Sequence, residues 1–334
     1  MVHTFMISNR ILSAKVFNEI YKELEKVSGL KPRKIKEVYV TEALKDKGFT
    51  HIMLTNKRID SKYKYNFIQI TIIINPVKLL GINKLELLKE DQVEELNDRF
   101  NSEINKIHHS LPRLDYWIAN RVDYAVNINT PYVKEYIKLF RRGDKPKGFK
   151  EYSRISTGRG EKGGLYLFNG SITVNFYDKE NERMFNGFNT EGAKDLLRLE
   201  VQCKISKTNT TKVKYHFDSK HIWNYLSEEI CRNQLQCYYD KVIGQGDYYT
   251  LSEAIKRVND SKYTPSTKSK LIDVLKDISL HRSICNARKE SQYNVNCFNR
   301  YLKQIRALGV NAVTIPARWK LDNLQNIYSN LLFR

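Results

Sequence analysis

The sequence predicts an α+β protein, in which an antiparallel β-sheet with its helices is followed by a helical domain at the C-terminus. Alternating or continuous apolar residues predict strands within residues 34–74 and 121–204, and apolar residues at helical spacing predict helices between and after them. After residue 247 the pattern becomes helical, with one short strand. At 334 residues the chain is long enough for at least two domains, each with its own core.

The first predicted unit covers residues 1–110. Three strand-like segments, KEVYVTEA, THIMLTN and NFIQITIII, carry β-branched or aromatic residues, and turns between them favour antiparallel pairing. Pro76 ends the last of them. Val93, Leu96, Phe100 and Ile104 then recur at helical spacing, so the unit is expected to end in a helix.

The second predicted unit, residues 111–247, continues the sheet. A strand at 121–128 is followed by Thr130 as a helix cap and Pro131 in the first turn. Because a strand, a proline and a helix also follow one another in ITIIINPVKLL, two related half-units are expected. A basic, Gly-rich loop at 141–164 precedes three more strands, GLYLFN, SITVNFYDK and LRLEVQCK, and a helix within 219–244.

The third predicted unit, residues 248–334, is a basic helical domain. Thr250 and Glu253 form a capping box, two further helices follow, and AVTIP predicts a short strand. Three helices with a terminal strand are typical of a helix-turn-helix or winged-helix unit, in which one helix enters the major groove of DNA. A helical cap that only completes the core is the alternative.

The charge points to a polyanionic partner. Lys and Arg number 57 against 37 Asp and Glu, a formal net charge of +20, which makes nucleic acid the leading partner. A generally basic, lysine-rich proteome is the alternative explanation of the charge. The five cysteines show no CxxC spacing, so we expect reduced thiols. Since no apolar run is long enough to span a bilayer and the first residues lack a signal-peptide core, we expect a cytoplasmic protein without a membrane partner.

A tyrosine pair, Tyr238 and Tyr239, with Lys241 close behind, is the candidate nucleophile. On a helix, Tyr238 and Lys241 share a face. A phenol with a pKa near 10 attacks phosphate only when a metal polarises the phosphoryl oxygen or a cation assists loss of its proton. The alternative is that both rings are core at the end of an amphipathic helix.

Carboxylates in apolar strands are the candidate metal ligands. Asp123 in RVDYAV and Glu200 in LRLEVQ interrupt apolar strands, and Asp178 in NFYDK is a third candidate. Converging carboxylates provide the hard oxygen ligands that Mg²⁺ or Mn²⁺ prefers. The alternative is internal ion pairing, because basic residues lie one or two positions away from each of them: Arg121, Lys179 and Arg198.

Histidines give a weaker signal. No His-hydrophobic-His triplet, the metal-binding strand of many nickases, occurs in the sequence. His51 in THIML is the one histidine kept as a possible ligand, and His108 and His109 are interpreted as surface residues.

Basic residues in the Gly-rich loop, beside the carboxylates and in the C-terminal unit are the candidate DNA contacts. They are Arg154, Arg159, Lys162, Lys179, Arg198, Lys303, Arg306 and Arg318.

Five segments in a fixed order carry a family resemblance. RVDYAVNI, ITVNFYDKENE, LRLEVQCK, YYDKVIGQGDYYTLSEA and LKQIRALGVNAVTIPARW resemble the phage and plasmid replication proteins of the gene II and gene X type, and more distantly the initiators of small Gram-positive rolling-circle plasmids. The resemblance runs from Arg121 to Trp319. It implies a Rep-like nuclease core within the α+β fold.

The resemblance also implies an activity, in which the enzyme nicks one strand of a double-strand origin and stays joined to the 5′-phosphate through tyrosine. By position, Tyr238 or Tyr239 would be the nucleophile, Lys241 its cationic neighbour, and Asp123 and Glu200 the metal ligands. The implied cofactor is Mg²⁺ or Mn²⁺. The expected partners are double-stranded origin DNA and single-stranded DNA, with host helicase, host polymerase and a second copy of the chain as further candidates.

Two other functions stay open at this stage. A sequence-specific DNA-binding protein without catalysis, for replication or copy control, would use the same basic C-terminal unit. A relaxase of a mobile element would share the nicking chemistry and act in transfer between cells.

Overall fold

The computed structural model describes residues 1–60, 65–151 and 163–327. The chain divides into two compact units, and its course passes between them several times. Unit 1 is Met1–Val126, Gly170–Thr173 and Glu200–Cys231, and unit 2 is Asn127–Asn169, Val174–Leu199 and Arg232–Arg334. The boundaries predicted at residues 110 and 247 each fall inside a unit.

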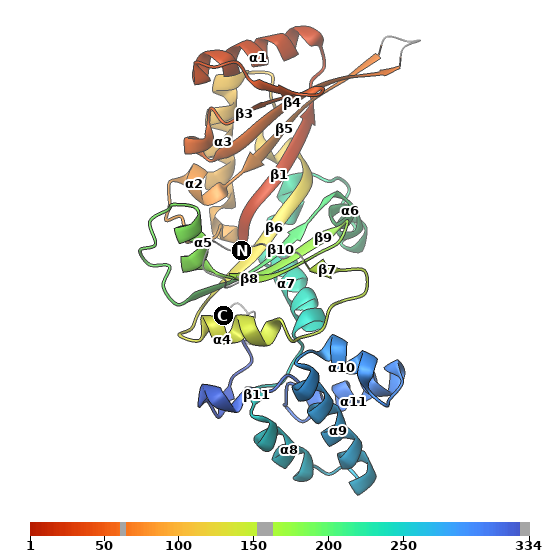
Figure 1. Cartoon of the computed structure of the whole chain (residues 1–334). Helices are drawn as coiled ribbons and strands as arrows, with labels where there is room; N and C mark the ends of the chain where they lie inside the picture. Colours follow the sequence, from red (N-terminus) through yellow and green to blue (C-terminus); the bar gives the residue numbers. More distant parts are fainter. Residues whose placement is uncertain (61–64, 152–162, 328–334) are drawn as a thin grey trace. The chain divides into compact units, whose positions relative to one another are not determined.

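Ten strands form a sheet in the order β2-β3-β4-β5-β1-β6-β10-β9-β8-β7 (Figure 1). The predicted antiparallel pairing is confirmed, for example between β1 and both of its neighbours, β5 and β6. The strands are β1 (Val2–Arg10), β2 (Arg33–Ile35), β3 (Val38–Thr41), β4 (Phe49–Asp60), β5 (Tyr65–Ile74), β6 (Ile118–Asn129), β7 (Lys150–Glu151), β8 (Gly164–Phe168), β9 (Ile172–Asp178) and β10 (Leu196–Cys203).

The two halves of the sheet have the same strand order. From one edge to the middle of the sheet the order is β2-β3-β4-β5-β1, and from the other edge to the middle it is β7-β8-β9-β10-β6. In this comparison β1 corresponds to β6, and β5 corresponds to β10. The two segments in which the sequence shows a strand, a proline and a helix are β5 with α2 (Pro76–Leu80) and β6 with α4 (Val133–Phe140). In the two halves of the sheet, β5 corresponds to β10 and β6 corresponds to β1, so β5 does not correspond to β6. The prediction that these two segments are related to each other is therefore wrong.

The remaining helices of the sheet region are α1 (Ala14–Ser28), α3 (Val93–Ile107), α5 (Lys179–Phe185), α6 (Ile205–Lys214) and α7 (Glu228–Val242). Phe17, Ile20 and Leu24 of α1 are buried, as are Leu96 and Phe100 of α3. These apolar faces cover the sheet, and α1 and α3 contact each other. The sequence predicts β3–β6 and α3 but not β1, α1, α5 or α6.

The C-terminal helices are α8 (Leu251–Asn259), α9 (Pro265–His281), α10 (Ile284–Glu290) and α11 (Val295–Ala307), drawn from teal to blue in Figure 1. The predicted capping of α8 is confirmed, because Thr250 Oγ1 accepts from Glu253 N–H. Two predictions are wrong: α10 adds a fourth helix, and AVTIP has only an isolated bridge, Thr250 to Ile315. The small sheet there pairs β11 (Tyr248–Tyr249) with β12 (Asn323–Leu324).

Two other features bear on the sequence predictions. None of the five cysteines, all of which the structure describes, forms a disulfide. Within the described ranges no helix combines the length and the apolar character that crossing a membrane requires.

Candidate active site

A β-bulge in β1 is the local feature that builds the site. Val2 pairs with Tyr124 and Thr4 pairs with Asp123, so three residues of β1 oppose two of β6 and His3 is the extra one. A β-bulge changes the direction in which a side chain points, away from the direction that regular alternation along the strand would give it. His3 and Thr4 both reach polar partners as a result, while Val2 and Phe5 are buried in the core.

Asp123 lies at the centre of this cluster in unit 1. Its carboxylate accepts a short hydrogen bond from Thr4 Oγ1 through Oδ2, and Oδ1 lies 3.0 Å from Arg121 Nε. Arg121 also donates to Thr4 Oγ1 at 3.3 Å. Although the ion pair is close, Oδ1 is buried and has no hydrogen bond of good geometry among the described residues.

Burial raises the pKa of Asp123 to about 7. The charge of Arg121 opposes this rise and that of Glu200 adds to it. A carboxyl with this pKa is protonated in some molecules and ionised in the others near neutral pH. Groups at functional sites often have pKa values shifted in this way.

Glu200 comes from β10, two strands away from β1. Its Oε2 lies 2.8 Å from His3 Nδ1, and its Oε1 accepts from Gln202 Nε2 at 3.1 Å. The Glu200 side chain is 6% exposed and that of His3 22%. Two carboxylates and an imidazole therefore meet on neighbouring strands, at a place that solvent reaches through His3.

The donor set fits a hard divalent cation. Carboxylate oxygens suit Mg²⁺ and Mn²⁺, and an imidazole held by a carboxylate through Nδ1 is the usual form of a metal-ligating histidine. The buried Oδ1 of Asp123 forms an ion pair with Arg121 but accepts no hydrogen bond of good geometry from the part of the chain that the structure describes. Among the described residues, no group of three or more His, Cys, Asp or Glu side chains lies close enough together to hold a metal ion.

The other carboxylate and histidine predictions have structural explanations. Asp178, in unit 2, is the N-cap of α5: Oδ1 accepts from Asn181 N–H at 3.1 Å and Oδ2 from Asn181 Nδ2 at 2.7 Å. Burial raises its pKa. His51 Nε2 lies 3.1 Å from Glu42, and His108 Nε2 lies 3.0 Å from Glu19. None of these side chains is part of the cluster around Asp123.

The two tyrosines near the end of α7 lie in unit 2, and both are buried, with different partners. Tyr239 is buried, its hydroxyl donates to Asn326 Oδ1 at 2.7 Å, and its ring packs against Phe140 and Phe176. Burial raises its pKa well above the ordinary value. These contacts are those of a core residue, because an ionised phenolate would be costly there.

Tyr238 faces a cation instead. Lys241 Nζ lies 4.9 Å from the centre of its ring, so the expected shared face is confirmed. The ring centre of Phe149 is 6.2 Å away on another side. Tyr238 is 6% exposed, which leaves a narrow part of the side chain accessible.

The candidate DNA contacts fall into three groups. Arg154, Arg159 and Lys162 lie outside the described residues. Lys179 and Arg198 are buried, the first donating to Glu182 at 2.8 Å and the second to Asn127 at 2.7 Å, so neither is displayed on the surface. The third group is in the C-terminal region: Lys303, Arg306 and Arg318.

Within that third group, Lys303 and Arg318 are exposed, whereas Arg306 is half-buried. The Arg306 guanidinium covers Gly244 so closely that a Cβ there would lie 2.4 Å from it. Burial lowers the Arg306 pKa. Of the three, Lys303 and Arg318 are placed to meet a ligand.

Arg318 belongs to a cluster of like charges that the sequence did not indicate. Burial, together with the charges of Arg282 and Arg318, lowers the pKa of Arg142. Arg142 is placed next to the start of α10 by the hydrogen bond from Ile284 N–H to its carbonyl, at 2.9 Å. Among the described residues, none of these three arginines has an ion-pair partner, in contrast to Arg288, which pairs with Asp144.

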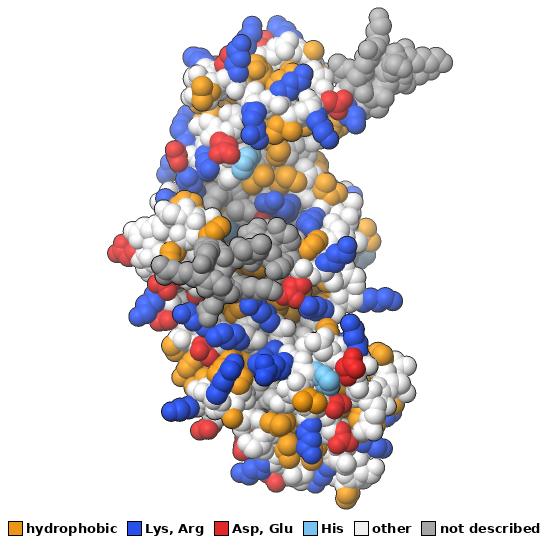
Figure 2. Space-filling model, in the orientation of Figure 1, with side chains coloured by type: hydrophobic (Ala, Val, Ile, Leu, Met, Phe, Trp, Pro, Cys, Tyr) orange, Lys and Arg blue, Asp and Glu red, His pale blue; other side chains and the backbone are white. Residues whose placement is uncertain are grey.

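Basic side chains are also spread widely over the surface. On the face drawn in Figure 2, Lys and Arg (blue) occur over the whole length of the molecule, with fewer Asp and Glu (red) between them. Such a surface favours association with a polyanion.

Comparison with known proteins adds no family: no family model matches the chain, and no curated protein matches it.

Proposed function

We propose that the protein is a metal-dependent DNA-nicking enzyme that initiates rolling-circle replication. The observation that carries the proposal is the cluster of His3, Asp123 and Glu200, in which a buried carboxylate oxygen lacks a well-directed hydrogen bond. A second is that Lys241 lies beside the ring of Tyr238, whereas the Tyr239 hydroxyl donates to Asn326.

His3, Asp123 and Glu200 would hold the metal ion in this proposal, and Asp178 is left out because it is the N-cap of α5 in unit 2 and is not part of this cluster. When bound, Mg²⁺ or Mn²⁺ supplies a Lewis acid that polarises the scissile phosphate. Thr4 and Arg121 fix the Asp123 carboxylate, and Glu200 fixes the His3 ring. Such orientation removes the reorganisation that would otherwise slow the reaction.

The covalent step uses Tyr238 as the nucleophile. Its phenolic oxygen bonds to phosphorus, the bond from phosphorus to the 3′-oxygen breaks, and a 5′-phosphotyrosine forms. The phenolic proton passes to water, and the leaving 3′-oxygen takes a proton from water. Lys241, above the Tyr238 ring, stabilises negative charge on the phenolate or the phosphate. Rejoining is the reverse of this step and needs no nucleotide.

The test uses purified full-length protein, Mn²⁺, and a supercoiled plasmid carrying the DNA that flanks the protein's own gene. We expect open-circular product with Mn²⁺, none with EDTA, and at least a 100-fold slower rate for Asp123→Asn. Asp178→Asn is the matched control and should nick normally. Equal rates for wild type and Asp123→Asn, or no nicking by wild type while it binds the same DNA, would overturn the proposal in favour of a DNA-binding protein without catalysis.

A further inference from the structure

Unit 1 contains a pocket whose charge is opposite to that of the chain. Its cavity volume is about 370 Å³, within the range of small-molecule sites. Three carboxylates line it, from Glu90, from Glu94 and from Glu229. Although the chain has 57 Lys and Arg, none of the described residues that line the pocket is basic.

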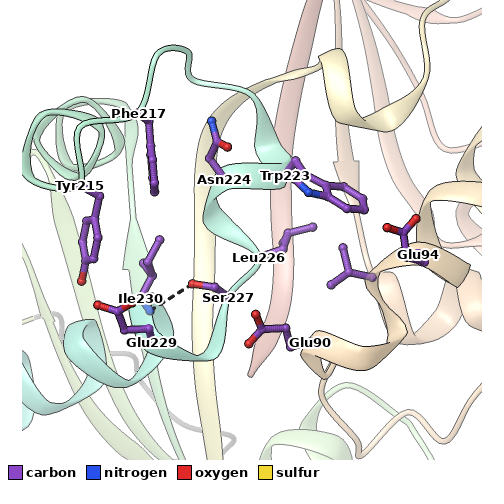
Figure 3. Close-up of a pocket in the computed structure, with 11 residues that line it drawn as sticks. Glu90, Glu94, Tyr215, Phe217, Trp223, Asn224, Leu226, Ser227, Glu229 and Ile230 are labelled. Carbon is purple, nitrogen blue, oxygen red and sulfur yellow. Dashed lines mark hydrogen bonds between the residues drawn. The ribbon is translucent and has the colours of Figure 1, made fainter.

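Aromatic rings form the other part of the wall. Tyr215 and Phe217 lie side by side in Figure 3, their ring centres 5.8 Å apart and nearly parallel, and Trp223 lies on the other side of the pocket near Glu94. The face of an aromatic ring attracts a cation. Tyr215 already makes such a contact within the chain, because Lys214 Nζ lies 5.1 Å from its ring centre.

The carboxylates are available for a ligand. Glu90 accepts from Glu228 N–H at 2.9 Å at the start of α7, and neither Glu94 nor Glu229 has an ion-pair partner among the described residues. Glu94 and Glu229 are exposed and come from different helices, with Leu226 and Ile230 on the wall between them. Carboxylates spread around an apolar wall do not converge as a metal shell does.

We propose that this pocket binds an organic cation, an ammonium or guanidinium group on an alkyl chain. The rings and aliphatic side chains take the alkyl part, and the carboxylates take the charge. The negative lining disfavours a phosphate ligand, so this site does not depend on the proposed DNA binding. The cation can come from a free polyamine or from a Lys or Arg side chain of a protein partner.

The binding experiment uses the full chain and isothermal titration with three probes: spermidine, the acetylated amide of arginine, and Mg²⁺. We expect spermidine or the arginine derivative to bind, and we expect that Mg²⁺ at equal ionic strength does not displace it. Binding of spermidine identifies a free polyamine as the ligand, and binding of the arginine derivative identifies a side chain of a protein partner. Binding of neither organic probe overturns the proposal, as does equal displacement by Mg²⁺.

Variants locate the site. Glu94→Gln and Glu229→Gln together should weaken the binding at least 10-fold, whereas Glu191→Gln, an exposed glutamate outside the pocket, should leave it unchanged. Trp223 supplies a second readout, since its fluorescence should change on titration of the wild type and not of the double variant. Equal affinity of wild type and double variant would contradict the assignment. Plasmid nicking is measured in parallel, so loss of one activity is distinguishable from loss of the other.

Discussion

His3 Nδ1 lies 2.8 Å from Glu200 Oε2, although 197 residues separate them in the chain. The contact depends on two features of the fold: β1 lies next to β6, and the bulge at His3 turns its ring toward β10. Asp123, on the strand between them, is influenced by the charge of Glu200. The polar cluster in the middle of the sheet is therefore a product of strand order, and each of its members has a testable role.

Asp123 should make stability depend on pH in a defined direction. Because the pKa of Asp123 in the folded state, about 7, is above the ordinary value of 3.8, the folded state retains between these pH values a proton that the unfolded state has lost. The contribution of Asp123 to the free energy of unfolding is therefore fully present below about pH 4 and is lost as the pH rises toward 7. Above pH 7 it does not change further.

Thermal unfolding in EDTA measures this effect. Asp123→Asn removes the titrating group, so the melting temperature of wild type relative to the variant should fall between pH 4 and pH 7. A difference that stays constant over this range, or increases with pH, would show that Asp123 is ionised normally in the fold.

The cluster of Arg142, Arg282 and Arg318 should contribute to DNA affinity. If the proposed function holds, Arg318→Ala would remove one phosphate contact, so affinity for duplex DNA should fall roughly 5-fold at 0.1 M salt, and the slope of log affinity against log salt should decrease by about one. Fluorescence anisotropy at several salt concentrations measures both. Lys256→Ala, exposed on α8, is the control, and an equal loss for the two variants would indicate only a general charge effect.

Gly48 should be intolerant of any side chain. Its φ is +90°, and a Cβ would lie 2.6 Å from Leu79 N, at the helix that follows β5. Gly48→Ala should cost about 2–4 kcal/mol of unfolding free energy, from backbone strain and the clash. Gly81→Ala is the matched control: its φ is +75° with nothing within 4 Å, so only the strain, about 1 kcal/mol, is expected. Urea unfolding of both variants decides the point, and equal costs would contradict the role of the close approach.

The sequence predicted Asp123 and Glu200 for a sound physical reason. A charge in an apolar strand needs a partner, and in the structure both carboxylates have one. His3 was missed because β1 itself was missed, and because a bulge leaves no trace in the alternation of residues. The available signal was a histidine and a threonine together in the otherwise apolar VHTFMI. Asp178 was predicted as a metal ligand for the same reason, but in the structure its carboxylate is explained by its role as the N-cap of α5.

The fold was predictable in its class and in much of its sheet, and less so in its arrangement. Strands β4 and β5 are long and rich in β-branched residues, so local pattern identifies them. The correspondence of β1 with β6 is not visible in the sequence, because it rests on strand order and not on similar residues. AVTIP has strand composition, yet Ile315 makes only an isolated bridge, because no neighbouring strand extends beside it.

Tyr239→Phe tests the structural role of the second tyrosine. The change removes the hydroxyl that donates to Asn326 Oδ1, so it should cost about 1–2 kcal/mol of stability. Urea unfolding of Tyr239→Phe against the wild type measures this loss, and an unchanged free energy of unfolding would contradict the structural role of the hydroxyl.

The covalent protein–DNA adduct is the most direct measurement of the central claim. Wild type is incubated with Mn²⁺ and the plasmid, the reaction is stopped with denaturant, and the DNA-linked peptide is identified by mass spectrometry. We predict a 5′-phosphotyrosine at residue 238, its absence in Tyr238→Phe, and its persistence in Tyr239→Phe. An adduct in the Tyr238→Phe protein, or a wild type that nicks without becoming attached to DNA, would contradict the account.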